Sequence, residues 1–280
     1  MPIFDTPEPI TAVIEITAGR VEIKASDRAD TVVEVRPRDE TREADVHAAE
    51  QTQVEYSNGQ LSVRAPKNKL RSLLGRYPSI ELTIELPSDS RVDAKGWADY
   101  RSEGRIGESS FDTAAGSIRL EETGGLKLRT AAGNVSVGRS SGHIDVSTSS
   151  GKIWIGEVDG GAVVKTANGD IIVGEVTDDV RLNTANGDIS VHRALAAVSA
   201  KTAYGSVRIG EVVRGTIVLE TSFGELELGV REGTAAWLDV NSKHGSIRSD
   251  LQASDNPAAS DDTVEVRART GYGDIVIRRP

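Results

Sequence analysis

Two carboxylates and two amides recur at equivalent positions and could together hold a metal ion. They flank two glycines eighteen residues apart and are Asn168, Asp170, Asn186 and Asp188. Oxygen ligands that converge in this way are the ligands that Ca²⁺ prefers. The alternative is a solvated turn whose charge is offset by the nearby Lys152. Because the glycine-rich nonapeptide of calcium-binding β-helices is absent, we favour the turn, and we expect no cofactor and no calcium.

Two glutamates could in principle form the carboxylate pair that cleaves glycosidic bonds. They belong to a series at equivalent positions, which is Arg139, Glu157, Glu175, Arg193 and Glu211. Opposite charges mostly alternate along this series, and ion pairs between neighbouring strands explain that pattern. The repeats are short and uniform, without the long loops that wall the cleft of a β-helix enzyme. We therefore predict no catalytic residues and no enzymatic activity.

An apolar patch is the third candidate. Trp154 and Ile172 occupy outward positions between buried neighbours in successive repeats. An exposed tryptophan above an exposed isoleucine could bind a protein partner or a sugar ring. The alternative is that the chain's own segments cover this patch, and we favour that alternative.

All these residues lie in a repeat, a Thr-x-x-Gly phrase that returns about every eighteen residues. The phrase begins at Thr113, Thr130, Thr148, Thr166, Thr184, Thr202 and Thr221, then at Ser242 in a variant form, and finally at Thr270. A fixed period of this size indicates a solenoid, in which each repeat buries its apolar edge by stacking on its neighbours. The glycine suits a backbone conformation that a Cβ would penalise, and the threonine hydroxyls are expected to stack into a ladder. Asn168 and Asn186 are expected to form an amide ladder.

Apolar residues alternate on both sides of each glycine. In one repeat, Ala162 and Val164 precede the threonine, and Ile171 and Val173 follow the glycine. This period of two predicts two short strands, each with one buried face, and Val176 adds a shorter third arm. The sequence therefore predicts an all-β fold, a single-stranded parallel β-helix with about eighteen residues per coil.

The first third of the chain differs. Residues 1–95 carry alternating strands without the regular period, so we predict irregular β coils that cap the open end of the solenoid. Residues 96–280 are predicted to form the regular β-helix, in one continuous domain with the cap. Residues 67–76 form a basic amphipathic stretch, and residues 249–262 are predicted to form a polar loop before the last coil. The final Arg-Arg-Pro argues against an open strand edge at the C-terminus.

Composition narrows the function. The 280 residues have a net charge of −10, which does not suit nonspecific binding of nucleic acid. The absence of cysteine excludes disulfides and thiolate metal sites. The sequence contains no run of eighteen apolar residues, which is the length that a membrane span needs. Its first residues lack the basic and apolar regions of a signal peptide. We therefore predict no membrane span and a cytoplasmic location.

The repeat phrase, with the lead-in Ile80-Glu-Leu-Thr-Ile-Glu-Leu-Pro-Ser88, resembles the bacterial putative-adhesin family with β-strand repeats, also called the toastrack domain. The resemblance is strongest between Thr113 and Ile277. It implies a right-handed parallel β-helix without known catalytic residues. Members are often linked to cell-envelope stress systems, and many are tethered to a membrane.

These observations favour a non-enzymatic scaffold or interaction module, adhesin-like, that binds a protein partner or associates with itself. A carbohydrate-binding or carbohydrate-cleaving β-helix centred on Trp154 is a second hypothesis. A third, from the resemblance alone, is a cytoplasmic regulatory partner of an envelope-stress or transporter system.

Overall fold

The computed structural model describes residues 1–66, 77–251 and 262–280. The chain divides into two compact units, an N-terminal unit, Met1–Ser141, and a C-terminal unit, Gly142–Pro280. The basic stretch predicted at residues 67–76 lies outside the described residues, as does most of the loop predicted at residues 249–262. The single-domain prediction, with its boundary at residue 95, stays a prediction.

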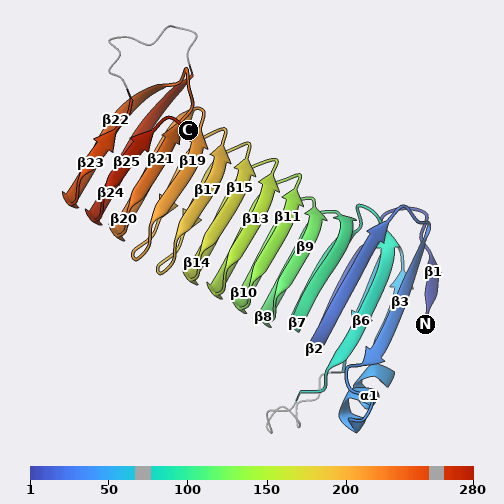
Figure 1. Cartoon of the computed structure of the whole chain (residues 1–280). Helices are drawn as coiled ribbons and strands as arrows, with labels where there is room; N and C mark the ends of the chain where they lie inside the picture. The colour runs from blue at the N-terminus through green and yellow to red at the C-terminus, as the bar shows by residue number, and fades with distance from the viewer. Residues whose placement is uncertain (67–76, 252–261) are drawn as a thin grey trace. The chain divides into compact units, whose positions relative to one another are not determined.

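The N-terminal unit is built of parallel coils whose strands lie side by side. The coil strands are β2 (Thr11–Ser26), β7 (Arg91–Ile106), β8 (Ser109–Ala115), β9 (Ile118–Thr123), β10 (Leu126–Ala132) and β11 (Val135–Ser140). β7 pairs in parallel with β2 on one side and with β8 and β9 on the other. Figure 1 shows β2, in dark blue, between β6 and β7. β2 and β7 each form a whole coil, because they continue through Gly19 and Gly96 without a break.

Further strands and one helix cover the outer edge of β2. They are β1 (Ile3–Asp5), β3 (Asp30–Pro37), α1 (Glu43–Glu50), β4 (Gln53–Ser57), β5 (Gln60–Arg64) and β6 (Ile80–Pro87). β5 and β6 pair in parallel with β2, whereas β3 runs antiparallel to β6, β4 to β5 and β1 to β3. In α1 the buried Asp45 accepts a hydrogen bond from the backbone N–H of Ser79 at 3.1 Å. These elements form the β cap, and they protect the first coil from pairing with another strand.

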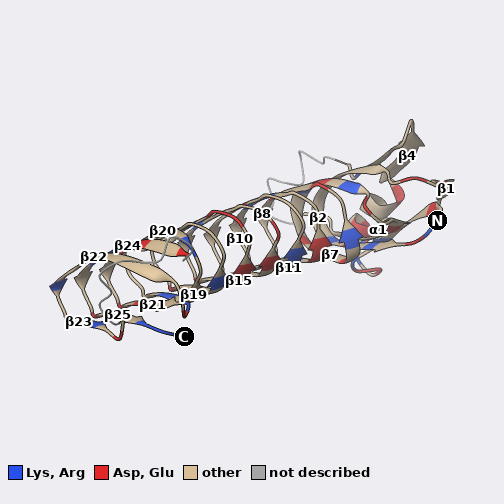
Figure 2. Cartoon of the chain, turned by 90° about the horizontal axis from the view of Figure 1, so that it is seen from above, with Lys and Arg blue, Asp and Glu red and all other residues tan. Residues whose placement is uncertain are grey.

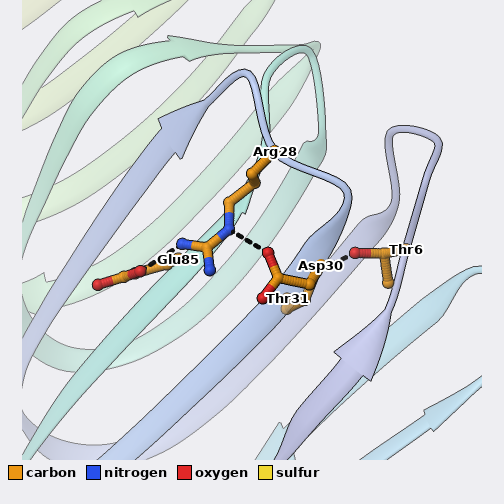
Figure 3. A network of polar contacts seen from close by, with 5 residues as sticks. All are labelled: Thr6, Arg28, Asp30, Thr31 and Glu85. Atoms are coloured by element: carbon orange, nitrogen blue, oxygen red, sulfur yellow. Dashed lines mark hydrogen bonds and ion pairs between the residues drawn. The ribbon is translucent and has the colours of Figure 1, made fainter.

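A polar network fastens the turn between β2 and β3 (Figure 3). The guanidinium of Arg28 contacts the carboxylates of Glu85 on β6 and of Asp30, the latter at 2.9 Å. The hydrogen bond from Arg28 lowers the pKa of Asp30. Beside it, the buried hydroxyls of Thr6 and Thr31 share a hydrogen bond of 2.8 Å, which ties the turn after β1 to β3. The network joins segments of the cap that are far apart in the sequence.

The C-terminal unit repeats one coil of two strands. The strands are β12 (Ile144–Ser150), β13 (Ile153–Val158), β14 (Ala162–Asn168), β15 (Ile171–Val176), β16 (Val180–Asn183), β17 (Ile189–Ala194), β18 (Val198–Lys201), β19 (Val207–Val212), β20 (Gly215–Phe223), β21 (Leu226–Val230), β22 (Ala235–His244), β23 (Ile247–Ser249), β24 (Thr263–Tyr272) and β25 (Ile275–Arg278). From β12 to β21, each strand pairs in parallel with the equivalent strand of the next coil.

The core of the C-terminal unit is a set of aliphatic columns, each made of equivalent residues on successive coils. In one of them Ile153, Ile171, Ile189 and Val207 face one another in register and are fully buried. The parallel β-helix fold, with its coil of about eighteen residues and its β cap, is confirmed.

The threonines of the repeat have a different role from the one expected. The hydroxyl of Thr184 donates to the carbonyl oxygen of Gly169 at 3.1 Å, and that of Thr202 donates to the carbonyl oxygen of Gly187. The expected hydroxyl ladder is therefore wrong at these positions. The carbonyl oxygen at the corner of the preceding coil needs a donor, and the threonine hydroxyl of the following coil lies within reach to supply one.

The order of the last coils differs from the order in the sequence. β24 pairs in parallel with β20 on one side and with β22 on the other, and β25 likewise lies between β21 and β23. β25, the last strand of the chain, therefore lies between two other strands and is not an edge. The expectation that Arg-Arg-Pro protects an open strand edge therefore concerned the wrong strand. The polarity of the inward residues explains why β25 and not β23 is interior. Both inward residues of β25, Ile275 and Ile277, are buried and apolar, whereas β23 has the polar Ser249 opposite Ile277. We call β22 and β23, residues 235–249, the terminal coil.

Candidate functional site

The four residues predicted as a metal site lie at adjacent corners of the C-terminal unit. Asn186 donates through Nδ2 to Oδ1 of Asn168 at 2.9 Å, so the predicted amide ladder is confirmed. The backbone N–H of Asp188 donates to Oδ1 of Asp170 at 3.1 Å. Lys152 approaches the other carboxylate oxygen of Asp170 at 3.8 Å. The carboxylate of Asp170 therefore contacts both neighbouring coils.

The same bond recurs at other corners. Asp188 accepts from the backbone N–H of Ser206 at 2.8 Å, and Asp274 accepts from that of Ser246 at 2.8 Å. This backbone hydrogen bond lowers the pKa of Asp274. The aspartate after the glycine is thus a link between coils. Across the described parts of the chain, no group of three or more His, Asp or Glu side chains is placed to hold a metal ion. The preferred interpretation, a solvated turn that does not bind calcium, stays a prediction.

The glutamates considered for catalysis lie in one column around an arginine. Glu175 and Glu211 are the neighbours of Arg193 on the two adjacent coils. The guanidinium of Arg193 lies 3.5 Å from the carboxylate of Glu175 and 3.1 Å from that of Glu211. Such partly exposed pairs contribute a few tenths of a kcal/mol each. The column therefore has a structural explanation, and Figure 2 shows both charge types interspersed within each unit.

Trp154 and Ile172 are brought together as predicted, since they face each other in register on β13 and β15. Trp154 is 43% exposed and Ile172 is half-buried. The preferred interpretation, cover by the chain's own segments, does not fit an exposure of this size for Trp154. An accessible ring above an aliphatic side chain is a surface that can contact a partner. Its role in binding stays a prediction.

A column of stacked rings was missed in the sequence. Tyr204, Phe223 and Tyr272 stack with ring centroids 5.0 Å apart and planes within 2° of parallel. His244 of the terminal coil stacks on Tyr272 at 4.5 Å. The rings occupy the position before the corner glycine, so an aromatic residue at that place in the last repeats was the available signal. Stacking covers the ring faces and leaves their edges exposed, which does not suit binding a sugar ring face to face.

The terminal coil exposes residues that are buried in every coil behind it. Ile247 is 46% exposed, whereas Ile275, opposite it in register, is 1% exposed. Leu238 and Val240 are half-buried opposite the buried Val266 and Ala268. On the outward face of the same coil, Trp237 is 76% exposed. The terminal coil therefore combines an uncovered aliphatic edge with a prominent aromatic ring.

β22 is an edge strand within the part of the chain that the structure describes. Among the described residues its only strand partner is β24, on one side. An edge of this kind presents a row of unpaired N–H and C=O groups, which is a template for another strand. The terminal coil is the candidate interaction site, because it offers both hydrogen bonds and apolar surface.

Within the described residues, no helix is both long and apolar enough to cross a membrane.

Comparison with known proteins identifies the type of chain. Residues 12–278 match the family described as Toastrack DUF4097. Among curated proteins, none matches the chain.

Solved structures with a similar course of the chain include a putative adhesin from Bacteroides fragilis NCTC 9343, at 12% identity and a TM-score of 0.41, covering 99% of this chain and 95% of that one. A second, from Parabacteroides merdae ATCC 43184 and also described as a putative adhesin, has 11% identity and a TM-score of 0.42, covering 81% and 94%. A third, from Parabacteroides distasonis ATCC 8503 with the same description, has 12% identity and a TM-score of 0.37, covering 98% and 95%. At these TM-scores the likenesses carry no argument about function.

Proposed function

The chain belongs to the Toastrack DUF4097 family, and from this premise we propose that it is a non-enzymatic β-solenoid scaffold that associates with a second copy of itself through the terminal coil. The observation that carries the proposal is the exposure of Ile247, 46% against 1% for its neighbour Ile275 in the same inward column. Burial of apolar surface stabilises association by roughly 25 cal/mol per Å² before the costs of binding. A cytoplasmic location is part of the proposal, and cell fractionation tests it.

A second copy fits because β22 is self-complementary when it runs antiparallel to its own equivalent. Centred on Val240, this pairing sets Trp237 against Lys243 of the second copy and Asp239 against Asn241. No like charges then face each other, and Asp239 is already paired with Arg269 at 3.3 Å. A lysine near a tryptophan face contributes about 0.5–1 kcal/mol.

Two-fold symmetry supports the same arrangement. A symmetric dimer uses one surface twice, so every contact made by β22 is made again by its equivalent. Such a dimer uses the free edge of β22 in both copies, while the short β23, which among the described residues pairs with β25 alone, keeps a second edge. The paired edges then no longer present unpaired N–H and C=O groups to solvent.

The oligomeric state tests this proposal directly. Light scattering after size exclusion, over a concentration series, is expected to show a dimer that dissociates on dilution. Trp237→Lys sets a lysine against Lys243 of the second copy and removes an aromatic anchor. Loss of such an anchor weakens association by at least about 2 kcal/mol, or roughly thirtyfold in Kd.

The matched control is Trp154→Lys, which changes another exposed tryptophan of the same unit. This variant is expected to dimerise like the wild type. A monomer at every concentration would contradict the proposal. A loss of dimer in Trp154→Lys but not in Trp237→Lys would move the interface to the patch of Trp154 and Ile172.

A further inference from the structure

A groove of about 480 Å³ lies on the outer face of the N-terminal unit. β2, β7 and β9 each contribute an arginine to its wall, namely Arg20, Arg101 and Arg119. All three side chains are exposed. Three guanidinium groups around one groove are notable in a chain with a net charge of −10. The groove therefore differs in charge from the rest of the surface.

The strand register sets two of these arginines against each other. Arg101 on β7 is directly opposite Arg119 on β9, and the next coil offers Ser136 and not a carboxylate. Like charges directly opposite on neighbouring strands are destabilising. Elsewhere the columns place a carboxylate beside an arginine, as for Arg193 between Glu175 and Glu211. On its other side Arg101 faces Glu22 of β2, so Arg119, between Arg101 and Ser136, is the arginine with no carboxylate opposite it.

The partners of these arginines leave room for a ligand. Arg101 bonds Glu103 at 2.8 Å, on its own strand. Within the part of the chain that the structure describes, the side chains of Arg20 and Arg119 make no ion pair and no hydrogen bond. A guanidinium presents donors in a planar fork that matches an oxyanion in two bonds. An anion between Arg101 and Arg119 would satisfy both groups and remove their repulsion.

The rest of the groove is polar and not purely cationic. Glu22 and Asp99 line it beside the arginines, so the charged lining carries three positive and two negative groups. One oxygen of Asp99 accepts the backbone N–H of Ser117 at 2.8 Å. Carboxylates next to an arginine pair would repel a compact polyanion, but they accept hydrogen bonds from hydroxyl groups. The lining therefore suits a ligand that carries one oxyanion group and several hydroxyls.

We propose that this groove binds an acidic saccharide, with its oxyanion between Arg101 and Arg119 and its hydroxyls toward Glu22 and Asp99. The proposal goes beyond self-association and uses residues of the other unit. It is therefore independent of Trp237, and the Trp237→Lys variant is expected to bind the saccharide unchanged.

The test compares two sugars that differ only at C6. Calorimetric titration of the full chain with D-glucuronate is expected to show saturable binding, and D-glucose is expected to bind at least tenfold more weakly. Inorganic sulfate, which offers the anion without the hydroxyls, is expected to bind more weakly than glucuronate. Arg119→Gln is expected to weaken glucuronate binding roughly tenfold or more, the usual effect of losing a charged hydrogen bond.

The variants separate recognition from folding. Arg119→Lys keeps the charge but not the fork, so it is expected to bind less tightly than the wild type. Arg129→Gln, on β10 and outside the groove, is the charge-matched control and is expected to bind normally. Because it removes a repulsion, Arg119→Gln is not expected to lower the Tm of the ligand-free protein.

Three results would overturn the proposal. They are no saturable binding of glucuronate, equal binding of glucose or sulfate, and an equal loss in Arg129→Gln.

Discussion

Replacing Gly187 by alanine is expected to destabilise the C-terminal unit by about 4 kcal/mol or more, because two separate costs add. Gly187 has a φ of +144°, where residues with a Cβ are strained. A Cβ at this position would also lie 2.2 Å from the carbonyl oxygen of Gly169 on the preceding coil. Since that atom belongs to the backbone, the coils would have to separate. Thermal or denaturant unfolding followed by circular dichroism measures the loss.

Gly233→Ala is the matched control for this prediction. Gly233 also has a positive φ, of +80°, but a Cβ there would meet no atom within 4 Å. The variant is expected to cost about 1–2 kcal/mol, the backbone strain alone. If both variants lost the same stability, close stacking of the coils at the corner would not be the reason for the glycine.

Ile275→Ala is expected to cost about 2–5 kcal/mol, whereas Ile247→Ala is expected to cost less than about 1 kcal/mol. The two isoleucines occupy the same inward column on neighbouring coils, but only Ile275 is buried. The difference follows from β25 lying between β21 and β23. Equilibrium unfolding in urea, at a concentration below the range of dimerisation, gives both values.

The reverse result would show that the last coils stack in the order of the sequence. Ile247 would then lie inside the solenoid and Ile275 at its end. Such an outcome would also remove the candidate interaction site, because the terminal coil would no longer be the one with the exposed edge.

The repeat made most of the fold predictable. Alternation around each glycine predicted both strands of a coil, and the period of eighteen residues predicted their parallel stacking. The order of the last two coils was not predictable from this pattern, because both carry the corner glycine and both alternate. Two substitutions distinguish them: Ser242 replaces the threonine of the repeat, and Ser249 lies opposite the buried Ile277. Two polar residues are a weak signal in a sequence.

The candidate sites were predictable to different degrees. Equal spacing correctly placed Trp154 beside Ile172, and it placed Asn168 beside Asn186. It could not show that the carboxylate of Asp170 accepts a backbone N–H from the next coil, because that bond depends on the path of the chain at the corner.

The arginine groove had no signal in the repeat. Arg20 lies in the first coil, and the cap separates it by some eighty residues from Arg101, a spacing unrelated to the period.

Hydrogen exchange of the backbone amides tests the central claim most directly, because it reports on β22 without any substitution. The outward N–H groups of an edge strand exchange rapidly when they face solvent and slowly when a second strand accepts their hydrogen bonds. We predict that a peptide covering residues 235–244 exchanges more slowly at high protein concentration than at low, and that this protection is lost in Trp237→Lys. Exchange in β22 that does not depend on concentration, or protection that appears only around Trp154, would contradict the account.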